Sequence, residues 1–281
     1  MVKVIQTVAE MAALGREWRK EGKEVGLVPT MGYLHEGHLT LARRAVAENA
    51  LTVMSIFVNP IQFGVNEDLD QYPRDLSGDV AKAEQVGVDY VFAPTAAEMY
   101  PAGFAIKMDM TGVTETLCGA SRPGHFQGVM VVVSKLFHLV QPARAYFGQK
   151  DGQQLAVIRR MVADLNMPVE IIGVPIVREA DGLALSSRNV YLDEECRRQA
   201  LVLSQSLQKA QAAYAAGERQ AEALKTLIRQ EIATAPLAEI EYVEVVDALT
   251  MQPVADLAQP VMIAMAVRFK GTRLIDNILL G

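Results

Sequence analysis

Short apolar runs alternate with helical patterns over residues 2–175, and this alternation constrains the fold more than any other feature. Val25–Val28 and Leu51–Val58 are near-continuous apolar runs of strand length, and His38–Asn49 between them carries apolar residues at helical spacing. Strands that are apolar on both faces, joined by helices, are typical of a parallel sheet with a helical layer on each side. We therefore predict an α/β fold, a Rossmann-like doubly wound parallel sheet.

The same pattern gives the other elements of this region. The predicted strands are Val2–Ile5, Val25–Val28 with its end at Pro29, Leu51–Val58, Asp89–Phe92, Ala143–Phe147 and Val169–Gly173. The predicted helices are Val8–Lys20, His38–Asn49, Leu76–Val86, Gly128–Val140 and Gly152–Leu165.

The pattern changes after Pro175. Two short extended runs flank a turn at 180–182, and long helical patterns follow at Asp193–Ala216 and Arg219–Thr234. The chain then reads as strands at Ile240–Val246, Val261–Phe269 and Arg273–Leu279. Strands grouped apart from helices indicate an α+β domain. We predict a first domain over 1–175 and a smaller C-terminal α+β domain over 176–281.

Composition excludes several classes of partner and location. The 281 residues carry a formal net charge of −6, whereas a protein dedicated to nucleic acid is more often basic. No apolar run approaches the roughly 18 residues that cross a bilayer, and the N-terminus lacks the features of a signal peptide. The two cysteines, Cys118 and Cys196, lie far apart and indicate a reducing compartment. We expect a cytoplasmic protein with no nucleic-acid or membrane partner.

Polar residues gather where predicted strands end, the edge at which open α/β sheets bind ligands. His35 and His38 lie three residues apart at a strand-to-helix junction. A helix N-terminus attracts anions, and two imidazoles there can donate hydrogen bonds to phosphate. The alternatives are a capping or surface pair and a metal site, although the spacing lacks the acid and third ligand of a zinc motif.

Two later segments add positive charge and hydroxyl groups. Lys150 follows the strand ending at Phe147 and suits a phosphate, while Asp151 and Gln154 beside it also fit a helix capping box. The segment 186–188, Ser-Ser-Arg, offers compact donors for a polyphosphate or is a polar loop.

Two further loops carry candidate binding groups. Asn59 and Gln62 flank a proline after the strand Leu51–Val58, where their amides suit a polar substrate group or a carboxylate, or simply form a turn. The glycine-flanked loop that carries Arg122 and His125 is either an anion contact or a mobile lid.

Taken together, these segments resemble one family. The blocks Pro29–His38, Ser55–Gly64, Gly119–Phe126, Ala145–Gln154 and Val177–Leu192 are similar to those of the pantoate–β-alanine ligases, within the HxGH nucleotidylyltransferase superfamily. They fall between residues 28 and 192, about three-fifths of the chain. The resemblance implies a ligase of pantothenate biosynthesis in the coenzyme A pathway, working as a cytoplasmic homodimer. The domain over 1–175 would bind ATP and pantoate, and the domain over 176–281 would be a lid that keeps water from the adenylate.

The resemblance also implies a reaction and its residues. Pantoate would attack ATP to give pantoyl adenylate and pyrophosphate, and β-alanine would then release AMP and form pantothenate, with Mg²⁺ accompanying ATP. His38, His35 and Lys150 would be catalytic. The implied ATP-binding residues are Met31, Gly32, Tyr33, Leu34, His35, Glu36, Gly37, His38, Gly148, Gln149, Lys150, Asp151, Val177, Leu185, Ser186, Ser187 and Arg188. Pantoate and β-alanine would meet Gln62, Gln154, Asn59, Arg122 and His125, and Asp79 matches a metal-contacting acid.

Two other functions share part of this pattern. An adenylyltransferase of the same superfamily would leave the nucleotide in its product instead of releasing AMP. A nucleotide-binding regulator would need no catalytic groups, and the histidines, the lysine and the Ser-Ser-Arg segment argue against it.

Overall fold

The computed structural model describes residues 1–65 and 67–281, which form two compact units. The first comprises 1–110, 122–149 and 157–175, and the second comprises 111–121, 150–156 and 176–281. The division into domains at residue 175 and the lid role of the second one stay predictions.

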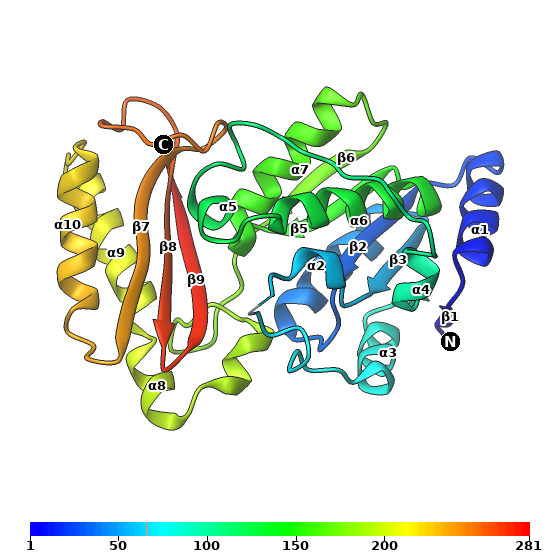
Figure 1. Cartoon of the computed structure of the whole chain (residues 1–281), viewed down its shortest axis with the longest axis horizontal. Coiled ribbons are helices and arrows are strands. Elements are labelled where there is room, and N and C mark those ends of the chain that lie inside the picture. Colours follow the sequence, from blue (N-terminus) through cyan, green and yellow to red (C-terminus); the bar gives the residue numbers. More distant parts are fainter. Residues whose placement is uncertain (66) are drawn as a thin grey trace. The chain divides into compact units, whose positions relative to one another are not determined.

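The first unit is built on a parallel sheet of six strands (Figure 1). Their order is β1–β4–β3–β2–β5–β6, so the sequence order reverses between β2 and β5. A ligand crevice forms at such a switch point, outside the carboxyl ends of the strands. The predicted doubly wound sheet is therefore confirmed. The strands are β1 (Lys3–Ile5), β2 (Val25–Thr30), β3 (Leu51–Ile56), β4 (Tyr90–Phe92), β5 (Arg144–Gly148) and β6 (Glu170–Val174).

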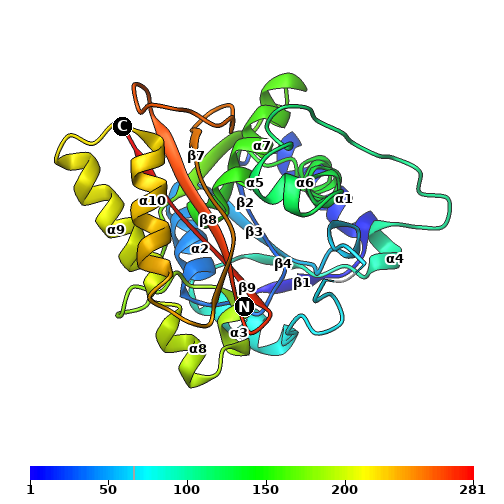
Figure 2. The same cartoon turned by 60° about the vertical axis from the view of Figure 1, so that its left-hand side comes forward.

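Helices cover both faces of this sheet. Helices α2 and α3 pack on one face, in a core with Val28, Met54 and Tyr146. Figure 2 shows α1 and α6 on the other side of the sheet from α2. Gly15 lets α1 pack closely against α6, because a Cβ there would lie 2.2 Å from the Leu139 carbonyl oxygen. The helices that carry residues of this unit are α1 (Val8–Lys20), α2 (Glu36–Glu48), α3 (Leu76–Gln85), α4 (Ala96–Met99), α6 (His125–Val140) and α7 (Gly152–Asp164).

The second unit places helices against an antiparallel sheet of three strands, in the order β7–β8–β9. The strands are β7 (Ala238–Asp247), β8 (Val261–Phe269) and β9 (Thr272–Leu280), and the helices are α5 (Leu117–Ser121), α8 (Glu194–Gln199), α9 (Val202–Ala215) and α10 (Ala221–Ile232). Leu207, Leu224, Ile228, Val243 and Ile263 are among the fully buried residues that join α9 and α10 to the sheet. The predicted α+β character of this region is confirmed.

Three predicted boundaries are wrong in ways that matter locally. Strand β2 runs through Pro29 to Thr30, because its pairing with β5 covers only Gly26 and Leu27 and leaves room for a residue without an N–H group. Helix α2 starts at Glu36 rather than His38, so His35 is its N-cap and His38 lies in its first turn.

The helix predicted over 193–216 is two helices, α8 and α9. Between them the Leu203 N–H donates to the Ala200 carbonyl three residues back, a tighter turn that interrupts the α-helical ladder. Among the described residues, no helix combines the length and apolar content that crossing a bilayer requires.

Candidate active site

The two histidines are themselves the cap of helix α2. The His35 ring accepts the Gly37 N–H at Nδ1 over 3.2 Å, and the His38 ring accepts the His35 N–H at Nδ1 over 3.3 Å. The rings stack with centroids 4.0 Å apart. A ring nitrogen that accepts a hydrogen bond carries no proton, so each neutral imidazole holds its proton on Nε2. The capping pair therefore presents two Nε2 donors at a helix N-terminus, where phosphate is favoured.

A buried carboxylate holds the loop that leads to these histidines. The Asp79 oxygens accept the backbone N–H groups of Tyr33 and Leu34, each over 2.7 Å, and Lys82 donates to the Leu34 carbonyl over 2.8 Å. Burial raises the pKa of Asp79 although both backbone donors oppose it. Gly32 has a φ of +86°, and a Cβ there would lie 2.9 Å from Asp79 Oδ2, so this turn requires glycine.

The predicted metal role of Asp79 has to be judged against these bonds. Both of its oxygens are engaged by backbone donors and its side chain is 1% exposed. The described part of the chain contains no group of three or more His, Cys, Asp or Glu residues that could hold a metal ion. The metal assignment stays a prediction, and the contacts of Asp79 give it a structural role in the loop.

The predicted substrate amides lie at the end of β3, in the 3₁₀ turn η1 (Pro60–Gln62). Asn59 is buried and donates from Nδ2 to Gln62 Oε1 over 2.9 Å. The Nε2 group of Gln62 lies 3.3 Å from Met31 Sδ, which follows β2. The structure therefore brings three predicted site residues, Met31, Asn59 and Gln62, into one hydrogen-bonded group.

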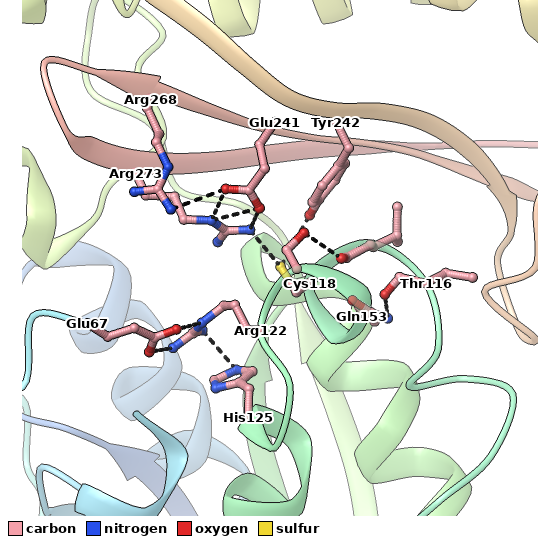
Figure 3. A network of polar contacts seen from close by, with 12 residues as sticks. Glu67, Thr116, Cys118, Arg122, His125, Gln153, Glu241, Tyr242, Arg268 and Arg273 are labelled. Atoms are coloured by element: carbon pink, nitrogen blue, oxygen red, sulfur yellow. Dashed lines mark hydrogen bonds and ion pairs between the residues drawn. The ribbon is translucent and has the colours of Figure 1, made fainter. Parts of the chain in front are cut away.

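Arg122 lies just before helix α6 and His125 is its first residue, and the two support this turn (Figure 3). Arg122 pairs with both oxygens of Glu67, over 2.7 and 2.5 Å, and also lies 3.1 Å from His125 Nε2. Because a guanidinium only donates, His125 accepts at Nε2, and its Nδ1–H donates to the Gln62 carbonyl over 2.9 Å. Although burial opposes it, the Arg122 ion pair lowers the pKa of Glu67. These contacts position the backbone of Gln62, and direct substrate binding by Arg122 and His125 stays a prediction.

Lys150 belongs to the second unit and lies in the 3₁₀ turn η2 (Gln149–Asp151), directly after β5. Asn277 of β9 donates from Nδ2 to the Lys150 carbonyl over 2.9 Å. The Lys150 ammonium is 3.8 Å from the Asp151 carboxylate, a distance beyond a hydrogen bond. The backbone of this lysine is thus held by another residue. Three residues further along the chain, Gln153 donates to the carbonyls of Val113 and Thr116. The predicted ligand Gln154, which follows it, is partly exposed.

A short hairpin brings the other predicted ATP residues of this unit together. Its strands meet at the Arg178–Ala184 bridge, and the Leu185 N–H donates to the Val177 carbonyl over 3.0 Å. The 3₁₀ turn η3 (Ser187–Tyr191) follows, and the Ser186 hydroxyl accepts the Arg188 N–H at its start. Val177, Leu185 and the Ser-Ser-Arg segment are therefore neighbours within one hairpin and its exit.

Buried polar groups brace this hairpin. Arg178 makes a bidentate ion pair with Asp276, over 2.6 and 2.9 Å, and Asp276 is 2% exposed. Asn189 donates to Glu179 and to the Ala184 carbonyl. No sequence pattern marked these braces, because their partners are up to 98 residues apart in the chain. Asp276 and Asn277 interrupt the apolar run 274–280 of β9, and that interruption was the one available signal.

A second polar cluster of this unit lies between α5 and the sheet. Arg273 pairs with Glu241, and the Cys118 thiol lies 3.2 Å from the Tyr242 hydroxyl (Figure 3). Both cysteines of the chain are buried and unpaired with one another.

Comparison with known proteins agrees with the motifs. The family model described as pantoate-beta-alanine ligase matches residues 3–279. Pantothenate synthetase of Pelotomaculum thermopropionicum is 56% identical over 278 residues, which cover 99% of each chain.

Two solved structures extend this similarity to the fold. Pantothenate synthetase of Thermus thermophilus matches with a TM-score of 0.93 and 48% identity, covering 99% of both chains. Pantoate-beta-alanine ligase of Francisella tularensis, solved as a complex with beta-gamma ATP and beta-alanine, matches with a TM-score of 0.81 and 30% identity over 99% of this chain and 98% of that one. The chain belongs to the pantoate–β-alanine ligase family, as its sequence motifs predicted.

Proposed function

We propose that this chain joins pantoate to β-alanine through an acyl-adenylate intermediate. A carboxylate oxygen of pantoate attacks the α-phosphorus of ATP, forming pantoyl adenylate and releasing pyrophosphate. The amine of β-alanine then attacks the acyl carbon, a proton leaves the nitrogen, and AMP departs as pantothenate forms. The ligation is the activity for which the family is named, and its prediction is thereby confirmed. The Francisella tularensis complex supports ATP and β-alanine as ligands of this chain.

The observation that carries the adenylate step is the capping pair His35–His38. Each ring accepts a backbone N–H at Nδ1, so its proton lies on Nε2. The helix cap, rather than solvent, therefore fixes which nitrogen donates. Transfer of a nucleotidyl group requires positioning and neutralisation of charge that builds on phosphate oxygens. Two preset N–H donors at a helix N-terminus supply both, and we assign the main donor role to His38.

The other predicted residues have complementary roles in the proposal. Lys150 offers a compact positive charge to the phosphates, as do the donors of Ser186, Ser187 and Arg188. Gln62 and Gln154 orient pantoate, and Gln62 serves β-alanine in the second step. We also propose that the other ATP-binding residues implied by the family resemblance contact the nucleotide.

We treat Mg²⁺ as part of the nucleotide substrate. Magnesium is commonly held by substrate phosphates together with one or two carboxylates and water. Asp79 is already bonded to two backbone N–H groups, so the proposal gives it no metal ligation and routes no step through the ion.

The test is AMP formation by the purified chain with ATP, pantoate and β-alanine, with each substrate omitted in turn. The adenylate route predicts that labelled pyrophosphate exchanges into ATP with pantoate alone. An exchange that requires β-alanine contradicts this route. A stable product that retains the adenylyl group, without free AMP, supports the adenylyltransferase instead.

The homodimer and the cytoplasmic location are also proposals, supported by the family resemblance and by the low cysteine content. Sedimentation of the purified chain at several concentrations tests the dimer, and a mass near the 30.7 kDa of one chain contradicts it.

A further inference from the structure

A chain of hydrogen bonds in the first unit ends at Gln62. The Tyr100 hydroxyl donates to Asn59 Oδ1 over 2.7 Å. Asn59 Nδ2 donates to Gln62 Oε1 over 2.9 Å and to the Gly128 carbonyl over 3.1 Å. Gln62 Nε2 then faces Met31 Sδ at 3.3 Å. The four links come from α4's end, η1, α6 and the loop after β2, all within one unit.

The direction of every link follows from one group. A backbone carbonyl can only accept, so the Asn59 amide must turn its NH₂ toward Gly128. Its Oδ1 then faces Tyr100, which must donate, and its second N–H faces Gln62, whose Oε1 must accept. The NH₂ group of Gln62 is therefore the end that points away from Asn59.

The groups that start this chain are themselves fixed. A Cβ on Gly128 would lie 2.3 Å from the Ile61 carbonyl oxygen and 2.6 Å from Gln62 Cα, so only glycine lets α6 approach η1 closely enough for the Asn59 bond. Burial raises the pKa of Tyr100 well above its usual range, so its hydroxyl keeps the proton that it donates. Its ring packs between Phe57 and Phe104.

We propose that Tyr100 is a positioning residue that, with the Gly128 carbonyl and Asn59, holds Gln62 as a hydrogen-bond donor toward the pantoate carboxylate. This inference rests on the proposed function of Gln62. A glutamine can offer either an oxygen or an NH₂ group, and only the NH₂ group attracts a carboxylate. Without the Tyr100 proton, Asn59 Oδ1 is left buried and unsatisfied, and only the Gly128 carbonyl still holds the amide in this orientation. Gln62 then turns its oxygen toward the substrate for part of the time.

The test is Tyr100→Phe, with Tyr146→Phe as the matched control. Tyr146 is also a buried tyrosine of this unit whose hydroxyl meets an asparagine, Asn49, at 2.7 Å, and the proposed site does not include it. We expect Tyr100→Phe to raise the KM for pantoate about tenfold, the scale of a hydrogen bond to a charged group, while the KM for ATP changes less than about twofold. The control should leave both constants unchanged.

The variant also separates orientation from general damage. Pantoamide replaces the carboxylate with a group that offers N–H donors, so it should lose less affinity than pantoate when Gln62 presents its oxygen. We expect its inhibition constant, relative to the KM for pantoate, to fall in Tyr100→Phe. Unchanged KM for pantoate, or equal increases for pantoate and ATP, would overturn the proposal.

A second measurement covers the case in which Tyr100→Phe does not fold. In the unmodified chain, the Gln62 side-chain NH₂ signals, identified by their loss in Gln62→Ala, should shift in NMR spectra when pantoate is added. If the signals do not shift in an enzyme whose AMP formation depends on pantoate, the positioning role alone is overturned. A wild-type chain that forms no pantoate-dependent AMP overturns the proposed function instead.

Discussion

The two regions that carry the predicted nucleotide-binding residues hold them in different ways. In the first unit, His35 and His38 are both the proposed phosphate donors and the cap of helix α2. In the second unit, the Lys150 ammonium is the proposed phosphate contact, but a different residue holds the Lys150 backbone. Asn277 does so by donating to the Lys150 carbonyl. Chemistry and local stability are therefore joined in one region and separate in the other.

The buried acids of the two regions differ in the same sense. Asp79 binds the N–H groups of the functional loop directly, whereas Asp276 pairs with Arg178 at the start of a hairpin. A carboxylate bonded to backbone fixes the loop residue by residue. The ion pair of Arg178 fixes only the first strand of the hairpin. Other contacts, such as those of Asn189, hold the rest of it.

His38→Ala is the change with the largest expected effect. We expect adenylate formation to fall roughly 10²-fold or more, the scale of one transition-state donor. The free energy of unfolding should also fall, by about 0.5–1.5 kcal/mol, because the bond to the His35 N–H is lost. Pyrophosphate exchange and urea unfolding measure the two effects.

His38→Glu separates them, because glutamate at this position of a capping box can accept the same N–H but has no N–H of its own to donate. It should recover the stability without the activity. A glutamate variant that regains near-wild-type exchange contradicts the donor role of His38.

Lys150→Ala should give the contrasting result. We expect the first half-reaction to slow by about 10²-fold, since one charge on the phosphates is lost, with little effect on the attack of β-alanine on preformed adenylate. The free energy of unfolding should change by less than about 0.5 kcal/mol. Single-turnover rates of each half-reaction, with urea unfolding, provide the measurement.

Lys150→Arg is the matched variant, and it should not restore full activity because a planar fork is not a compact point charge. Equal losses in both half-reactions would refute the phosphate role. A stability loss as large as that of His38→Ala would remove the contrast between the two regions.

The sequence was sufficient for the features that depend on local pattern. Strand and helix periods predicted both sheets, and the histidine spacing predicted a helix N-terminus with donors. A capping role for His38 was predicted only as an alternative to a phosphate role, whereas the structure shows the cap and our proposal combines the two roles. A ring that accepts at one nitrogen can still donate from the other, and no spacing rule shows that.

The supporting residues were not predictable in this way. Tyr100 lies 41 residues from Asn59, and Asp79 lies 46 residues from Tyr33. A buried acid or tyrosine in a helical or loop segment has no local signature of the backbone group it will meet. Such bonds follow from tertiary placement, so composition and periodicity carry no information about them.

Gln62→Ala should have an intermediate effect. We expect each half-reaction to slow by about tenfold, because Gln62 orients a carboxylate in both and a hydrogen bond to a charged group is lost. Gln62→Glu should be slower still, since it places a carboxylate against carboxylate substrates. Rates measured with pantoate and with preformed adenylate decide the matter, and an effect on one step alone would limit Gln62 to that substrate.

Asp79→Asn should act on stability more than on chemistry. One of the two bonds to the loop is lost because an amide NH₂ cannot accept, and we expect the free energy of unfolding to fall by about 1–3 kcal/mol. Adenylation should slow only severalfold as the loop loosens. Asp75→Asn is the control, since asparagine caps a helix as well as aspartate does at the start of α3. Equal stability losses in both variants would mean that the loop does not depend on Asp79.

The smallest expected effect is the pH dependence that Asp79 gives to folding. Burial raises the pKa of this carboxyl group in the folded chain, so the folded state binds more protons than the unfolded state in the acid range. The stability that the group contributes is then full below its unfolded pKa and is lost as the pH rises through the folded one. Relative to Asp79→Asn, the wild-type free energy of unfolding should therefore decline from about pH 4 upward and then level off.

Urea unfolding of the two chains at matched pH values measures this difference. Asp276 provides the comparison in the other region, because its charge is matched by Arg178 rather than by backbone groups alone. A difference between wild type and Asp79→Asn that grows with pH would show that the two N–H donors outweigh burial. The first region would then stabilise a buried charge through backbone donors, where the second pairs its buried carboxylate with an arginine.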